Sequence, residues 1–164
     1  MKYFIHFIGI LIALSASRFL PHPPNFTSLI ALSFYVPFLL GKKYIPALLV
    51  SFALTDFIIG YHLTTHWTWG SVLIIGLVAN YFPNKIFFRI FGALFGAIIF
   101  YLITNFGVWT TGIYNLTIEG LVTSYVLAIP FFGYTLLSTF LFSILIELSV
   151  YLISKFFKLN ILKI

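Results

Sequence analysis

The chain has 164 residues, of which 62% are hydrophobic and only 7% are charged, and its formal net charge is +6. So few ionisable groups cannot cover a soluble globule of this size, and the composition therefore predicts a single polytopic membrane domain over residues 1–164. The absence of cysteine excludes a disulfide framework, a thiolate nucleophile and a Cys-ligated zinc or iron–sulfur site.

Six apolar stretches predict six membrane-spanning helices, with approximate bounds of 3–20, 26–40, 44–61, 70–82, 86–106 and 135–157. The first must stop at the run Pro21-His22-Pro23-Pro24, and Asn25 or Thr27 can cap the second. At 1.5 Å per residue, the second and fourth reach only about 20 Å of a hydrocarbon core of about 30 Å. Such short spans point to a cavity or binding site near the helix ends.

The segment 107–134, between the fifth and sixth spans, is too long for a tight turn and too apolar for a free loop. A helix over residues 117–129, ended by Pro130, is expected within it. If this helix crossed the bilayer, the C-terminal lysines would lie outside, against the charge rule for short loops. We therefore expect an all-α membrane protein, a six-helix bundle with an interfacial or re-entrant helix on its outer face.

The basic residues follow the predicted spans. Short loops rich in Lys and Arg stay cytoplasmic during insertion, so their distribution predicts a multi-pass protein of the cell inner membrane with both termini in the cytoplasm. The outer loops hold only Arg18, whereas the opposite side holds the other eight basic residues: Lys2, Lys42, Lys43, Lys85, Arg89, Lys155, Lys158 and Lys163. Orientation in the membrane thus accounts for the positive charge, and no nucleic-acid partner is expected.

The first helix allows a second interpretation. Lys2, the apolar run that follows it and the small triplet Ser15-Ala16-Ser17 resemble a secretory signal peptide. Cleavage after residue 17 would leave five spans in the same orientation. We expect the helix to be retained.

Small residues recur at every fourth position on two of the predicted helices. One face of the first helix lacks bulky side chains because it carries Gly9, Ala13 and Ser17. One face of the fifth helix lacks them because it carries Gly92 and Gly96. In lipid, such faces let another helix approach closely. Each set is expected either to pack inside the bundle or to dock a partner, and the first helix is the candidate partner-binding face.

Few ionisable residues fall within the spans, where each needs a partner or a polar cavity. Arg18 and Asp56 lie at similar depths near the outer side and are expected to pair, either as a structural ion pair or as part of an outward-facing site. Arg89 and Glu147 are a plausible second pair nearer the cytoplasm. Glu119 is the only acid in the outer loops and can alternatively cap the helix that begins near residue 117.

Histidines and tryptophans on the outer side carry weaker signals. His62 and His66 are spaced for one side of a helix, but the sequence around them indicates that the helix has already ended, and no carboxylate cluster accompanies them. No metal site is therefore expected. Trp67 and Trp69 are expected to be either interfacial anchors or lid residues over a ligand.

Polar and aromatic groups gather on the side opposite the lysines. Ligand sites combine apolar walls with a few convergent polar groups, and this inventory supplies both. The candidate ligand-binding residues are Arg18, His22, Asn25, Asp56, His62, Asn105, Trp109, Tyr114 and Glu119. An alternative is a membrane enzyme in which His22 or His62 is a base oriented by Asp56 or Glu119. A structural or assembly subunit is a third possibility.

Several sequence motifs resemble those of an uncharacterised bacterial membrane family. They are the segments 17–27 (SRFLPHPPNFT), 55–56 (TD), 60–62 (GYH), 105–109 (NFGVW), 117–121 (TIEGL) and 128–132 (AIPFF). That family is similar to the substrate-binding S-components of energy-coupling-factor (ECF) vitamin transporters. The chain departs from the family pattern at Tyr61, Ser124 and Thr139, where Phe, Cys and an acidic residue are common.

The resemblance implies six helices, an outer pocket closed by loops, and a first helix that docks a partner. S-components capture a micronutrient and topple when a separate transmembrane coupling subunit, driven by two ATPases, engages them. The chain itself has no Gly-x-x-x-x-Gly-Lys-Ser/Thr loop, so ATP hydrolysis must come from other chains, and no cofactor is expected. Aromatic loops would suit a planar heterocycle such as a vitamin, nucleobase or flavin.

Overall fold

The computed structural model describes residues 2–157, and this part of the chain is helical throughout, with no strand. It contains seven α-helices and two single-turn 3-10 helices (η). Their bounds are α1 Lys2–Phe19, α2 Leu29–Leu40, η1 Lys42–Tyr44, α3 Ile45–Ile59, α4 Thr65–Val78, η2 Ala79–Tyr81, α5 Ile86–Thr110, α6 Ile118–Val126 and α7 Ile129–Phe157. The predicted all-α class is confirmed. Lys158 and Lys163 lie outside the described residues.

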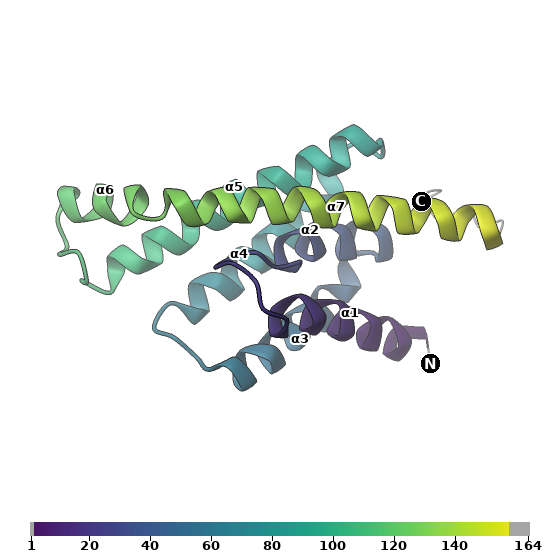
Figure 1. Ribbon diagram of the computed structural model, residues 1–164, viewed down its shortest axis with the longest axis horizontal. Coiled ribbons are helices and arrows are strands. Elements are labelled where there is room, and N and C mark those ends of the chain that lie inside the picture. Colours follow the sequence, from purple (N-terminus) through teal and green to yellow (C-terminus); the bar gives the residue numbers. More distant parts are fainter. Residues whose placement is uncertain (1, 158–164) are drawn as a thin grey trace.

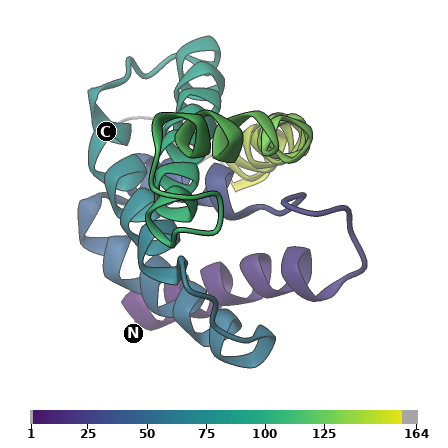
Figure 2. The ribbon, with the colours of Figure 1, turned by 90° about the vertical axis from the view of Figure 1, so that its left-hand side faces the viewer.

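Two long helices, α5 and α7, run along the length of the molecule, and the shorter helices α1, α3 and α4 lie on one side of them (Figure 1). Helix α2 packs against α3, α4, α5 and α7. Seen from the end, α1 lies apart from α7, and the segment that follows α1 runs between the two (Figure 2). The start of α1 and the end of α7 lie at the same end of the molecule, and the loop before α6 lies at the other (Figure 1).

The central helix α2 is apolar on all sides, which is the pattern of a helix enclosed by others. Every residue from Leu29 to Pro37 is buried, and the side chains of Phe34 and Tyr35 are almost completely enclosed. The hydrophobic core therefore forms around α2. Helices α1 and α3 pack mainly against each other beside it.

The two sets of small residues have different environments. A Cβ atom built on Gly92 would lie 2.4 Å from the ring of Phe34, so the glycine lets α5 approach α2 closely. The internal-packing interpretation thus holds for α5. On α1, Gly9 and Ala13 are exposed, and no atom lies within 4 Å of a Cβ built on Gly9. Ser17 instead faces inward, where its hydroxyl is 2.7 Å from the hydroxyl of Ser28.

Several helix boundaries differ from the predicted spans. Helix α4 begins at Thr65, five residues earlier than expected, and α5 continues to Thr110. Ser28 is the residue before α2, so neither Asn25 nor Thr27 is its N-cap. Pro130 does not end a helix: it lies in the first turn of α7, where proline is tolerated because the first amides of a helix lack intrahelical partners.

Within the described residues, α5 and α7 are long and apolar enough to cross a membrane, which indicates a membrane location. At 1.5 Å per residue they extend about 38 and 44 Å. Only 28% and 22% of their most apolar windows are buried, unlike the core helix of a soluble protein. The other helices are shorter, so six full spans remain a prediction.

Candidate ligand-binding site

The predicted pairing of Arg18 with Asp56 is confirmed. An Arg18 terminal nitrogen (Nη2) lies 2.6 Å from Oδ1 of Asp56, and only 14% and 6% of the two side chains are exposed. Arg18 comes from the last turn of α1, and Asp56 from the last turn of α3. The close packing of α1 on α3 brings the two ends together.

Further contacts fix both members of this pair. The second terminal nitrogen of Arg18 donates to the hydroxyl of Thr55 at 2.6 Å, and its guanidinium lies 4.6 Å from the ring centre of Phe52. The indole N–H of Trp69 donates to Oδ2 of Asp56 at 2.7 Å. Each carboxylate oxygen therefore accepts a hydrogen bond from the protein.

This ion pair lines a cavity of about 290 Å³ between α1, α2, α3 and the loops that follow α1 and α3. A second cavity of about 210 Å³ adjoins it and reaches α5 and the start of α7. Five residues line both cavities and therefore lie at their junction: Asn25, His62, Thr68, Phe100 and Thr135. The two cavities thus form one branched space into which five separate segments project.

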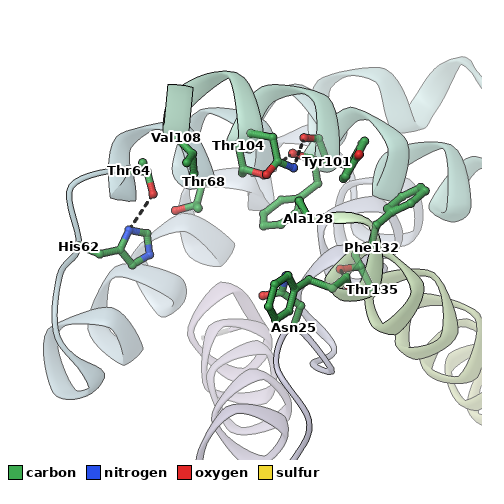
Figure 3. A pocket seen from close by; sticks show the side chains of 13 residues that line it. Asn25, His62, Thr64, Thr68, Tyr101, Thr104, Val108, Ala128, Phe132 and Thr135 are labelled. Carbon is green, nitrogen blue, oxygen red and sulfur yellow. Dashed lines mark hydrogen bonds between the residues drawn. The ribbon is translucent and has the colours of Figure 1, made fainter. Parts of the chain in front are cut away.

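Figure 3 shows the second branch, with His62 and Thr64 on one side and Phe132 and Thr135 on the other. Asn25 projects into it from the loop between α1 and α2. This residue has a positive φ of 63°, a conformation that asparagine tolerates better than most residues. The loop can therefore turn there and direct its amide into the junction.

Six of the nine predicted ligand-binding residues line this branched space: Arg18, His22, Asn25, Asp56, His62 and Asn105. The other three do not. Trp109 donates its indole N–H to the backbone oxygen of Thr117, and Glu119 is exposed in the first turn of α6. Tyr114 lies in the loop before α6, and its backbone oxygen lies so close to Gly120 that a Cβ atom there would overlap it. These three residues therefore belong to the α5–α6 connection.

Sequence reasoning missed several lining residues, including Thr68, Phe100 and Thr135 at the junction. Each was assigned to an apolar span or to a span end, and nothing in a lone Phe or Thr distinguishes a cavity wall from helix packing. The early start of α4 is part of the reason, because it puts Thr68 and Trp69 within a helix rather than in a loop.

The histidines have neutral partners. His22 lies at the exposed rim, with Nδ1 2.7 Å from the backbone oxygen of Pro23 and Nε2 3.3 Å from that of Arg18. His62 Nδ1 lies 3.0 Å from the Thr64 hydroxyl. Neither contact is with a carboxylate, so the geometry gives no support to a base oriented by Asp56 or Glu119. His66 lies in α4 and His62 precedes it, so they do not share a helix face.

No group of three or more His, Cys, Asp or Glu side chains within residues 2–157 is arranged to hold a metal ion.

A second ion pair, also predicted, lies at the other end of α5 and α7. Arg89 contacts both oxygens of Glu147 at 2.6 Å, and Tyr35 donates its hydroxyl to the same carboxylate at 2.9 Å. Arg89 also donates to the side chain of Asn84 at 2.7 Å. Arg89 is therefore a buried residue of the first turn of α5, and not the loop charge that the sequence analysis counted toward orientation.

Between the two ion pairs, α7 carries a buried polar stripe. Thr135, Thr139, Ser143 and Glu147 follow one another at four-residue intervals, and all four are buried. Thr135 donates to the backbone oxygen of Phe131, but the Thr139 hydroxyl has no hydrogen-bond partner among the described residues. Unsatisfied buried hydroxyls are costly, so this part of the core is polar without being tightly paired.

Comparison of the sequence with known proteins identifies its family. Residues 1–160 match a family of unknown function, DUF6580. The chain belongs to this family. No curated protein and no solved structure matches the chain.

Proposed function

We propose that the chain is a multi-pass membrane protein that captures a small micronutrient from the outer side of the cell inner membrane, in the manner of an ECF S-component. The observation that carries the proposal is the branched cavity, where polar and aromatic side chains from the α1–α2 loop, the α3–α4 loop, α4, α5 and α7 converge. Pockets that combine apolar walls with a few convergent polar groups are the usual form of small-molecule sites.

The position of the cavity supports outward capture. It is lined by Arg18 and Asp56 from the last turns of α1 and α3, so it lies at the end of α1 away from that helix's start and, as Figure 1 shows, away from the end of α7. Lys42 and Lys43 lie in η1, at the other end of α3. With these lysines on the cytoplasmic side, the cavity opens outward and both termini are cytoplasmic.

Transport would require partners, because the chain has no nucleotide-binding loop. Gly9 and Ala13 leave an exposed small-residue face on α1, which suits the close approach of a helix from a transmembrane coupling subunit. ATPase subunits on other chains would then supply the energy.

The proposal is tested by ligand retention. The protein is purified under gentle solubilisation, and small molecules that co-purify are identified by mass spectrometry. Specific enrichment of a compound, lost when Thr68 or Phe100 at the junction is replaced by a larger Trp, supports capture. Conversion of candidate compounds to a product on incubation would instead identify an enzyme.

The partner face is tested by replacing Ala13 with Leu. This change should abolish co-purification with a coupling subunit while leaving ligand retention intact, since the Ala13 side chain is exposed and lies away from the branched cavity. If the variant still co-purifies with the coupling subunit, α1 is not the docking face.

A further inference from the structure

The charged groups of the branched cavity neutralise each other. Arg18 and Asp56 supply its only formal charges among the described lining residues, and they are in contact with each other. His22 and His62 also line the cavity, but both are exposed to water, which screens charge. The buried part of the lining, which holds Arg18 and Asp56, therefore presents no net charge to a ligand.

Neither member of the pair is available to a charged ligand without a cost. Both oxygens of Asp56 already accept hydrogen bonds, from Arg18 and from the indole of Trp69. A ligand carboxylate that approached Arg18 would also approach the Asp56 carboxylate, and a ligand cation that approached Asp56 would meet Arg18. Separating the pair would leave a charge unpaired in a partly buried site.

The threonine hydroxyls around the junction already donate their hydrogens to other groups of the protein. Thr68, Thr104 and Thr135 each donate to a backbone oxygen of their own helix, at 2.7, 2.8 and 3.0 Å. The lone pairs of these hydroxyl oxygens remain free to accept, since a hydroxyl has one donor and two acceptor positions. The junction therefore favours a ligand that brings its own N–H or O–H donors.

Aromatic rings supply the walls. Phe100 lies at the junction, Phe52 lies in the first branch, and Tyr101, Phe131 and Phe132 lie in the second. Flat apolar surfaces of this kind pack well against a planar ring.

We propose that the site selects an uncharged, planar heterocycle with N–H or O–H donors and discriminates against anionic and cationic analogues of the same size. This inference rests on the proposed capture function and narrows its substrate class. Arg18 and Asp56 act here as a neutral pair that excludes charge, and not as a recognition site for an opposite charge on the ligand.

The test uses a defined mixture of matched compounds with the purified, full-length protein. It contains neutral, carboxylate and N-methyl-cation forms of a pyridine ring (nicotinamide, nicotinate and 1-methylnicotinamide), uracil with orotate, and riboflavin with its 5′-phosphate. Retained compounds are quantified by mass spectrometry after equilibrium dialysis. Within any set that binds, the neutral member should be retained at least about tenfold more strongly than its charged partners.

The second part of the test uses a variant that changes the charge of the cavity. Asp56→Asn leaves the Arg18 charge unpaired, so this variant should shift retention toward the carboxylate member by about tenfold relative to the wild type. Glu119→Gln is the matched control: it removes one negative charge from an exposed residue outside the cavity and should leave the retention profile unchanged. The double variant Arg18→Gln with Asp56→Asn restores neutrality and should again prefer the neutral member.

The outcomes separate the two proposals. Retention of charged members by the wild type would overturn the inference while leaving the capture function standing. Retention of no member by the wild type would overturn both. An identical shift in the Glu119→Gln control would also overturn the inference, because the selectivity would then follow overall charge and not the paired residues.

Discussion

The Arg18–Asp56 pair should behave as one energetic unit in protein stability. Replacing either residue with a neutral isostere, Arg18→Gln or Asp56→Asn, leaves its partner charged and partly buried. Losing one member of a buried pair typically costs about 3–5 kcal/mol, and the remaining exposure of Arg18, 14%, places this pair near the lower end of that range. We therefore expect about 3 kcal/mol for each single variant.

The double variant should lose much less than the sum. With both charges removed, what is lost is mainly two hydrogen bonds to the pair, from Trp69 and to Thr55, each worth about 1 kcal/mol. A total loss of about 2 kcal/mol, against about 6 kcal/mol for the sum of the single variants, leaves a coupling energy of about 4 kcal/mol, well above the usual additivity error of about 0.5 kcal/mol.

The assay is equilibrium unfolding in mixed micelles, followed by tryptophan fluorescence, because Trp69 contacts Asp56 directly. Ligand retention measured on the same four proteins should show the same non-additivity. Single-variant losses that simply add would refute the reasoning, since they would mean that each side chain is stabilised by other groups.

Three further predictions concern the rest of the molecule. A cysteine at Leu63, which is 76% exposed, should react with an impermeant thiol reagent in intact cells, whereas one at Tyr81, which is 80% exposed at the other end of α4, should not. Gly92→Ala should destabilise the protein by about 1–3 kcal/mol, because the new methyl group would overlap an aromatic ring, while Gly9→Ala should be neutral or slightly stabilising. Thr139→Val should be neutral or stabilising by up to about 1 kcal/mol in thermal unfolding, because it removes a buried hydroxyl that has no partner within residues 2–157.

Each of these predictions has an opposing result. Labelling of the cysteine at Tyr81 but not of the one at Leu63 would show that the protein has the opposite orientation in the membrane. Equal effects of the two glycine variants in chemical unfolding would show that α5 tolerates a wider separation from α2. A large loss of stability on Thr139→Val would show that the Thr139 hydroxyl is hydrogen-bonded in the protein.

The sequence allowed the ion pairs to be predicted because charges are rare in this chain. With three acids and nine bases in all, depth along the spans was enough to match Arg18 with Asp56 and Arg89 with Glu147. The helix class and the central positions of the helices followed from apolar run length. Those two signals do not depend on side-chain packing.

The cavity walls could not be predicted in the same way. Phe100 and Thr135 belong to continuous apolar helices, and whether such residues face a cavity, lipid or another helix depends on rotation about the helix axis. The sequence of a uniformly apolar helix does not indicate which of its faces points toward the core. Trp109 and Glu119 do not line the cavity for a different reason: they are near it in the sequence pattern, but both lie on the α5–α6 connection.

The position of α2 also affects how the protein is made. This helix is synthesised second, yet its burial is complete only when α5 and α7 have been added, more than 100 residues later. At a synthesis rate of about 5–20 residues per second, the wait is roughly 5–25 s. In the proposed multi-pass arrangement, lipid would surround α2 during that interval, and because α2 is apolar on every side, no charge would be exposed to the lipid. The same uniform surface that gives α2 no preferred orientation in the sequence would thus let it remain in the bilayer until its final neighbours arrive.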